Sequence, residues 1–121
     1  MNKQALQTKI VTVAGADTYE DLGPAIPQNM RRYVYQIKVI SPNIGTNKVT
    51  IADRLGVAAE TEKDAWYLVT AYSTVMHPDV LAENAAPVYI FEASSSTADR
   101  MIRIKSDTLG AIVTIWYCDE P

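Results

Sequence analysis

Hydrophobic and polar residues alternate along several short segments of the chain, and this period of two predicts β-strands with one face on a core. Between Arg32 and Ile40 the odd-numbered residues are apolar or aromatic, whereas the even-numbered residues are mostly polar. We therefore expect the odd-numbered side chains of this segment to face the core. The last such segment is apolar at nearly every position, which predicts a central strand. The expected strands are Lys9–Ala14, Thr18–Leu22, Arg32–Ile40, Lys48–Asp53, Trp66–Tyr72, Val88–Ala93, Arg100–Lys105 and Ile112–Cys118, with a short piece near Val80–Leu81.

Turn-forming residues divide the chain into pieces that are too short for packed helices and long enough for strands. The polar segments Ser41–Asn47, Ser94–Asp99 and Ser106–Gly110 are expected to close hairpins. Helix is expected only as one or two turns, at Thr61–Trp66 and at Pro78–Asn84.

The whole pattern predicts an all-β chain of eight or nine strands, folded as an antiparallel two-sheet sandwich of jelly-roll type. Jelly-roll and immunoglobulin-like connections produce the same linear pattern, so the strand order stays open at this stage. Two prolines in Gly23–Pro27 require extended backbone, which predicts an edge or a crossing between sheets. With 121 residues, 48% of them hydrophobic, we expect one domain over residues 10–121 and a flexible arm over residues 1–9.

Two parts of the sequence resemble each other. The run from Arg32 to Asp53 is echoed by the run from Arg100 to Asp119, because each contains a basic strand, a polar turn and a strand that begins Val-Thr-Ile. The echo has two explanations. One is a duplicated hairpin in equivalent places in the two halves of a sandwich. The other is the convergence expected of any two hairpins that have one wet face.

Composition narrows the chemistry, since the chain has one histidine, His77, and one cysteine, Cys118. A single cysteine excludes a disulfide framework and a cysteine-rich zinc site, and we interpret Cys118 as a core residue. The net charge of -3 opposes nucleic-acid binding, and Arg31–Arg32 is the only pair of adjacent basic residues. There is no glycine-rich phosphate motif and no apolar run long enough for a membrane span or signal peptide. We expect no cofactor, no nucleic-acid partner and no membrane partner.

Candidate chemistry centres on His77, which is close in sequence to Asp79. A metal site would need Glu83 or Asp64 as further ligands, and a small hydrolase would need a nucleophile such as Ser73. Neither arrangement has supporting spacing, so we interpret His77 as a loop residue beside a turn-forming proline. We therefore predict no enzyme activity, no catalytic residue and no metal ligand, although the dispersed carboxylates leave a carboxylate-only site open.

The aromatic residues are the remaining candidates for a binding surface, because the chain has seven tyrosines and two tryptophans but one phenylalanine. Tyr33, Tyr35 and Tyr72 occupy regular strand positions and are expected in the core or between the sheets. In the other strands, Tyr67, Tyr89 and Tyr117 have the opposite parity to Trp66, Val88 and Trp116, so one of these two sets is expected to point outward. Clustered outward rings would form a contact surface or a platform for stacking sugars.

The layout resembles the small β-sandwich proteins of tailed-phage and related virus particles, namely head decoration (cement) and minor structural proteins. The resemblance rests on a polar and apolar N-terminal arm, on Ile26–Tyr35 leading into a long strand, and on a last strand, Val113–Glu120. It implies a non-enzymatic virion protein, made in the host cytoplasm, that stabilises a capsid as a homo-oligomer, commonly a trimer. It also implies that the arm adds a strand to the shell.

The residues predicted to bind a partner are few. Leu6, Ile10 and Val13 would anchor the arm on a major capsid or other virion protein, and the basic pair Arg31 and Arg32 is added to them. The alternative function is a carbohydrate-binding β-sandwich module, which the same aromatic residues and scattered carboxylates would serve. A third class, a small hydrolase, would depend on His77.

Overall fold

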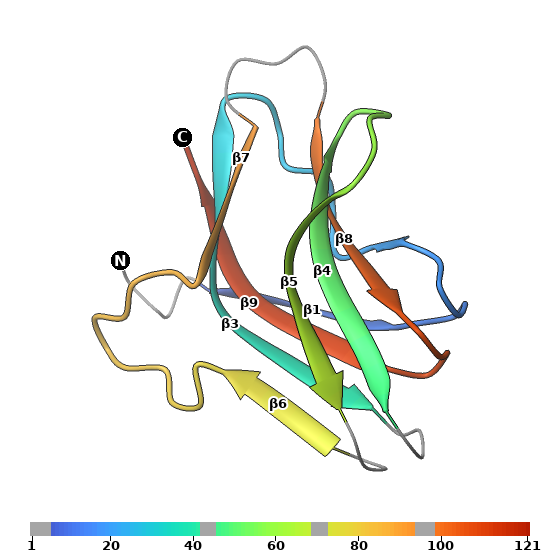
Figure 1. The fold of residues 1–121 in the computed structure, drawn as a ribbon. Helices are drawn as coiled ribbons and strands as arrows, with labels where there is room; N and C mark the ends of the chain where they lie inside the picture. The colour runs from blue at the N-terminus through green and yellow to red at the C-terminus, as the bar shows by residue number, and fades with distance from the viewer. Residues whose placement is uncertain (1–5, 42–45, 69–72, 94–98) are drawn as a thin grey trace.

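A computed structural model describes residues 6–41, 46–68, 73–93 and 99–121 of the chain, and its secondary structure there consists of strands (Figure 1). The strands are β1 (Gln7–Thr12), β2 (Glu20–Asp21), β3 (Met30–Ser41), β4 (Asn47–Leu55), β5 (Thr61–Leu68), β6 (Ser73–His77), β7 (Tyr89–Ala93), β8 (Arg100–Ser106) and β9 (Ile112–Glu120). The prediction of an all-β chain with eight or nine strands is therefore confirmed.

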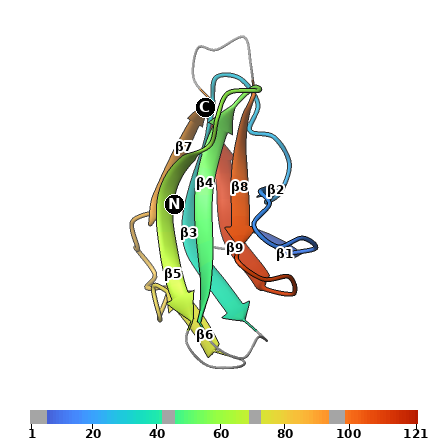
Figure 2. The same cartoon turned by 45° about the vertical axis from the view of Figure 1, so that its right-hand side comes forward.

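The strands form two antiparallel sheets that face one another. The five-stranded sheet has the order β1-β9-β3-β6, and β7 pairs with the other half of β3 on the same side as β6. The four-stranded sheet has the order β2-β8-β4-β5; Figure 2 shows β5, β4 and β8 side by side in front of β3 and β9. If β6 and β7 are counted as one interrupted strand, this is the order of a jelly roll. The prediction of a central last strand is also confirmed, because β9 lies between β1 and β3.

The three predicted hairpins are wrong. In each of the pairs β3 and β4, β7 and β8, and β8 and β9, the two strands lie in different sheets, so the chain passes from one sheet to the other between them. Among consecutive strands of the described chain, only β4 and β5 pair with each other. A short polar loop suits either connection, and the choice depends on where the apolar faces are buried. Gly23–Pro27 crosses between the sheets as expected, and Ile26 in it is fully buried beside its bridge partner Arg100.

The expected parity of β3 holds only for its C-terminal half. A β-bulge between Val34 and Gln36 inserts Tyr35 as an extra residue opposite β9. After the bulge, the odd-numbered Ile37 and Val39 face the core, but before it the inward side chains are Arg32 and Val34. Because a single extra residue reverses the side-chain alternation, the strand changes which parity it buries halfway along its length.

Several local predictions are corrected. Thr61–Trp66 is extended and belongs to β5, so the predicted helical turn is wrong there; Pro78–Asn84 forms bends and turns without a helix. No strand forms at Val80–Leu81, and the strand at Ser73–His77 was not predicted. The predicted strand at Trp66–Tyr72 coincides with β5 only up to Leu68, and residues 69–72 lie outside the described part of the chain.

The core is the layer of aliphatic side chains between the two sheets. Ile37, Val113 and Ile115 of the five-stranded sheet lie in it together with Ile51 and Ile104 of the four-stranded sheet, and all five are at most 1% exposed. Burial of this apolar surface supplies most of the favourable free energy of folding, at about 25 cal/mol per Å².

At the N-terminal end of the described chain, β1 begins at Gln7, so Gln7–Lys9 belong to the sheet, and residues 1–5 lie outside the description.

Candidate functional site

The outer face of the four-stranded sheet is charged. Because side chains alternate along a strand, the residues between the core positions of β4 and β8 point away from the core. Arg103 is paired there with Asp21 and with Glu60, whose carboxylate lies 3.3 Å from the Arg103 Nε, and Arg54 approaches the same Glu60 at 3.7 Å. Lys48 lies 3.8 Å from Glu62. Charged side chains paired with one another in this way are typical of a protein's own surface.

The outer face of the five-stranded sheet is different in character. The register of β1, β9, β3 and β6 places a set of hydrophobic side chains on the side away from the core, and we call this set the apolar face. Ile10 in it is 60% exposed and the other members are half-buried. The middle row of this face, read across the four strands, is Ile10, Thr114, Lys38 and Met76, and Thr8, Thr12 and Thr74 lie at its margins. Lys38 is the one charged side chain among the outward-facing residues of the ranges 8–12, 36–40, 74–76 and 112–116. The apolar face consists of Ile10, Ile40, Met76, Ile112 and Trp116.

The apolar face ends at β1, which is an edge strand of its sheet. β1 is bound to β9 along its whole length, from Gln7 opposite Tyr117 to Thr12 opposite Ile112. The Tyr117 hydroxyl adds a side-chain bond by donating to Gln7 Oε1 at 3.2 Å. The segment is thus well anchored on one side, and its other side is the margin of the sheet.

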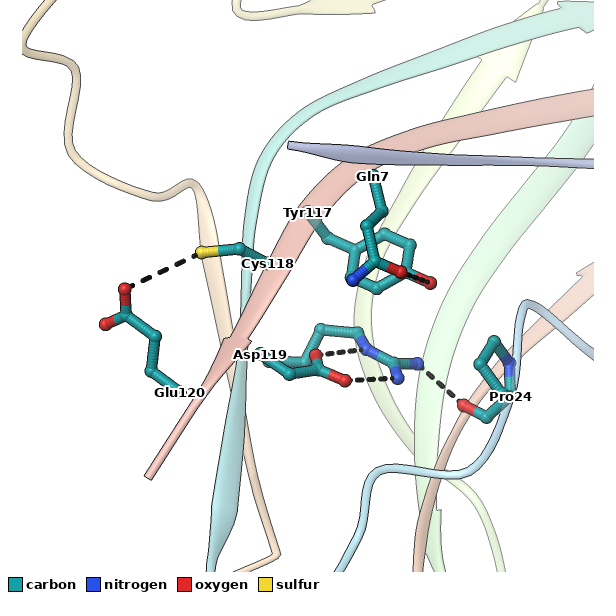
Figure 3. Close-up of polar contacts among 7 residues, drawn as sticks. Gln7, Pro24, Tyr117, Cys118, Asp119 and Glu120 are labelled. Carbon is teal, nitrogen blue, oxygen red and sulfur yellow. Dashed lines mark hydrogen bonds and ion pairs between the residues drawn. The ribbon is translucent and has the colours of Figure 1, made fainter. Parts of the chain in front are cut away.

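A buried ion pair holds the far end of β9 to β3. The guanidinium of Arg32, 1% exposed, donates from Nε and Nη2 to the two carboxylate oxygens of Asp119 at 2.7 and 2.8 Å. Nη1 donates to the carbonyl of Pro24 at 2.7 Å, and the group lies over the ring of Tyr117, 4.4 Å from its centroid (Figure 3). Because the charge is paired with a carboxylate and each of the three guanidinium nitrogens donates a hydrogen bond, its burial is tolerated.

The sequence echo has a counterpart in these pairs. Arg32 and Asp53 bound the first run, and Arg100 and Asp119 bound the second. In the structure each arginine is paired with the aspartate of the other run, since Arg32 binds Asp119 and Arg100 binds Asp53. The two runs therefore lie in equivalent places in the sandwich, joined as β3 to β9 and as β8 to β4. In each run the two strands lie in different sheets, so neither run is the hairpin that the sequence predicted.

The second polar cluster joins the sheets at the side where β5 faces β7. The hydroxyl of Tyr89 on β7 donates to Asp64 Oδ2 on β5 at 2.6 Å, and Asp64 Oδ1 accepts the amide of Ala65 at 2.8 Å. Burial, followed by the bond to Asp64 and the charge of that carboxylate, raises the pKa of Tyr89 far above its usual range. Tyr89 is therefore a permanent donor, and the pair acts as a clamp between the sheets.

His77 lies next to this clamp. Its ring centroid is 6.3 Å from that of Tyr89, and its side chain is exposed at the end of β6. Among the described residues, no group of three histidine, cysteine, aspartate or glutamate side chains is placed to hold a metal ion. The side chain of Ser73 lies outside the described atoms. The described side chains of this cluster contact one another and hold the sheets together. They do not place a nucleophile beside an oriented base.

The residues predicted to bind a partner are placed in three environments. Val13 and Arg32 are both 1% exposed and belong to the protein's own interior. Leu6 is half-buried at the start of the described chain. Ile10 and Arg31 are exposed, and Arg31 forms a surface ion pair with Glu92 at 3.1 Å. Ile10 alone of the five is an exposed apolar residue, and its neighbours Ile112 and Trp116 on the apolar face were not predicted as contact residues.

The aromatic side chains are mostly covered. Tyr35 and Tyr117 are buried, Tyr33 and Tyr89 are half-buried, and Tyr72 lies outside the described residues. Within the described ranges, Tyr67 at 64% is the one tyrosine, tryptophan or phenylalanine classed as exposed. Neither alternating set points outward as a whole.

Cys118 is buried, and burial, with the nearby charges of Glu120 and Asp119, raises the pKa of its thiol.

Comparison with known proteins yields structural likeness only. No protein-family model matches the chain, and neither does any curated protein. A solved structure of the CBM22-1 and GH10 modules of the Clostridium thermocellum xylanase 10B, in complex with xylohexaose, matches 96% of this chain and 24% of its own length, with 10% identity and a TM-score of 0.43. A structure of infectious bursal disease virus, Gx strain, matches 93% of this chain and 36% of its own, with 8% identity and a TM-score of 0.33. The chain thus spans about a quarter of the length of the first protein and about a third of the length of the second.

One finding bears on membranes: within the described ranges, no helix is long and apolar enough to cross a bilayer.

Proposed function

We propose that this chain is a non-enzymatic structural protein of a virus particle, which stabilises a capsid by binding to its surface as a homo-oligomer. The observation that carries the proposal is the contrast between the outer face of the four-stranded sheet and the apolar face, which is the part of the other sheet's outer face that lies away from the Arg31–Glu92 ion pair. One face is covered by ion pairs, whereas the apolar face has five hydrophobic side chains around the single charge of Lys38. A surface on which hydrophobic side chains outnumber charges is suited to a protein contact.

The fold is compatible with this proposal and with the alternative. Jelly rolls occur in viral capsid domains and in lectins, so the architecture alone is compatible with the assembly role and with carbohydrate binding. A sugar platform needs two or three exposed coplanar rings, and the described residues offer one exposed ring, Tyr67, on the charged side of the sandwich. A protein contact needs instead hydrophobic side chains gathered on a flat surface, and the apolar face supplies these around Thr114 and Lys38.

The proposal is tested by mass and by binding to shells. Light scattering measures the mass of the purified protein, and co-sedimentation measures its binding to empty shells assembled from the major capsid protein of the same genome. We expect a homo-oligomer that co-sediments. A charge on the apolar face, Met76→Glu, is expected to abolish co-sedimentation, whereas the matched change on the other outer face, Tyr67→Glu, leaves it intact.

Two outcomes overturn the proposal. One is a protein that does not co-sediment with the shells, whatever its mass; the other is binding that Met76→Glu and Tyr67→Glu weaken equally. Thermal melting of both variants confirms that each is folded before its binding is compared. A glycan array tests the alternative role, and a specific hit that Tyr67→Ala removes would replace the assembly role by carbohydrate binding.

A further inference from the structure

The four sheet margins differ in how they are protected. β2 has two residues, β5 carries a bulge beside Glu62 and Asp64, and the margin formed by β6 and β7 is interrupted after His77, where Pro78 follows. Short strands, bulges and prolines all prevent a sheet edge from pairing with another chain. β1 has six residues in regular register with β9, without a bulge or a proline. It is the one margin in the described chain that is ready to accept another strand.

The register of β1 with β9 determines which residues of β1 direct their backbone N–H and C=O groups toward the open side. The Val13 amide, which follows β1, donates to the carbonyl of Ala111 at 2.8 Å, so the odd-numbered residues direct their backbone groups toward β9. Hydrogen bonding alternates along an antiparallel strand. The N–H and C=O groups of Thr8, Ile10 and Thr12 therefore point outward from the sheet. The side chains of these three residues lie on the outer side of the sheet, opposite Trp116, Thr114 and Ile112.

The three residues with outward backbone groups, Thr8, Ile10 and Thr12, form the same series, Thr-Ile-Thr, in either direction along the strand. We propose that two copies of the chain pair antiparallel through β1, with Ile10 opposite Ile10 of the second copy and Thr8 opposite Thr12. In this register each of the three residues donates one backbone bond and accepts one. The inference rests on the proposed homo-oligomer and names the surface that builds it.

The same register suits the side chains. Ile10, 60% exposed in one copy, is covered by its counterpart, and cross-strand pairs of β-branched residues stabilise antiparallel sheets. Lys9, the one charged residue of β1, lies opposite Val11 of the second copy and not opposite another lysine. The five-stranded sheets join into one sheet across the two-fold axis, and the two apolar faces become continuous.

A two-fold pair closes on two copies, whereas the resemblance to phage proteins implies a trimer. The palindromic set favours a second copy over an unrelated strand, since an unrelated strand gains nothing from the symmetry. The expected mass is therefore twice 13.4 kDa. A strand supplied by a shell protein would use the same backbone groups, and the experiment below separates the two occupants.

The test uses the full chain with three changes at residue 10. Ile10→Pro removes the outward N–H without touching a bond to β9, and Ile10→Lys places two positive charges opposite each other. We expect both variants to be monomers by light scattering at about 100 μM, with melting behaviour that shows them folded. Ile10→Glu is expected to be a monomer too, and an equimolar mixture of the Lys and Glu variants is expected to recover the dimer. Tyr67→Lys, on the edge strand of the other sheet at similar exposure, is the control and stays dimeric.

The result that overturns the inference is a mass that Ile10→Lys and Ile10→Pro leave unchanged, or a mixture that does not recover the dimer. A wild-type trimer overturns it as well, while the proposed assembly role survives. A wild-type monomer that binds shells, and loses that binding with Ile10→Pro, assigns the edge to a strand of the shell and refutes self-pairing. Failure of the proposed function is a separate result, namely no binding to shells by any variant.

Discussion

The Arg32 guanidinium and the Asp119 carboxylate form a two-bond ion pair in the interior, at 2.7 and 2.8 Å, with the arginine 1% exposed. Arg32 lies on β3 and Asp119 on β9, directly opposite in register. The pair therefore ties the central strand β9 to its neighbour near the C-terminal end of the chain. A third bond to the Pro24 carbonyl attaches the segment that crosses between the sheets.

Loss of one partner of this pair is expected to be costly. Arg32→Ala leaves Asp119 without its two donors, and Asp119→Ala leaves a buried guanidinium charge. Breaking a buried pair from one side typically costs about 3–5 kcal/mol of unfolding free energy. The adjacent Arg31, whose pair with Glu92 is exposed on both sides, is the matched control, and Arg31→Ala is expected to cost about 0–1 kcal/mol. Urea unfolding measures both values, and equal losses would contradict the buried pair.

The Tyr89–Asp64 clamp predicts a smaller loss. Tyr89→Phe keeps the ring and removes the hydroxyl that donates to Asp64 at 2.6 Å, so a half-buried carboxylate oxygen loses its partner. We expect a decrease of about 1–3 kcal/mol in the free energy of unfolding. Tyr67→Phe removes an exposed hydroxyl and is expected to change stability by less than about 0.5 kcal/mol. Denaturant midpoints that are the same for both variants would argue against the clamp.

The raised pKa of Tyr89 predicts a loss of stability in alkali. An unfolded tyrosine releases its proton near pH 10, whereas the folded Tyr89 keeps it. Above about pH 10 the unfolded state therefore binds fewer protons than the native state, and stability falls as pH rises. Urea unfolding between pH 8 and about 11 is expected to show a steeper fall for the wild-type protein than for Tyr89→Phe. Parallel curves would contradict the raised pKa of this phenol.

Burial of Cys118 predicts a thiol that reacts slowly. Its pKa is raised first by burial and then by the charges of Glu120 and Asp119, so little thiolate is present near neutral pH. Alkylation by iodoacetamide in the native state is expected to be much slower than in urea. Glu120→Gln removes one of the charges and is expected to accelerate the native reaction. If native and unfolded protein react at one rate, the thiol is accessible and this account of it is wrong.

The positions of Arg32 and Val34 mark the limit of prediction from the strand pattern. Alternation placed Tyr33 inward and Arg32 outward, and it was correct for Ile37 and Val39. The bulge at Tyr35 reversed the first half of the strand. No residue type marks this bulge in the sequence, because it contains neither a glycine nor a proline. Arg32 is inside because Asp119, which is distant in sequence, and the carbonyl of the nearby Pro24 are there to bind it.

The candidate contact surface was predictable only in part. Ile10 was expected to contact a partner, and it is exposed on an edge strand. Ile40, Met76, Ile112 and Trp116 join it on the apolar face because four strands are aligned in register, and β6, which carries Met76, was not predicted at all. A period of two specifies which residues share a face of one strand, but it does not specify which strands are neighbours.

The sequence by itself determined that the chain is all-β with eight or nine strands and that the last strand is central, because alternation and turn residues act over a few positions. Only the tertiary structure decided the jelly-roll order, since a short polar loop can close a hairpin or arch between sheets. That choice is made by burial of apolar faces against each other, which involves residues far apart in the chain. The same long-range packing set the open edge at β1 and the pairing of Arg32 with Asp119.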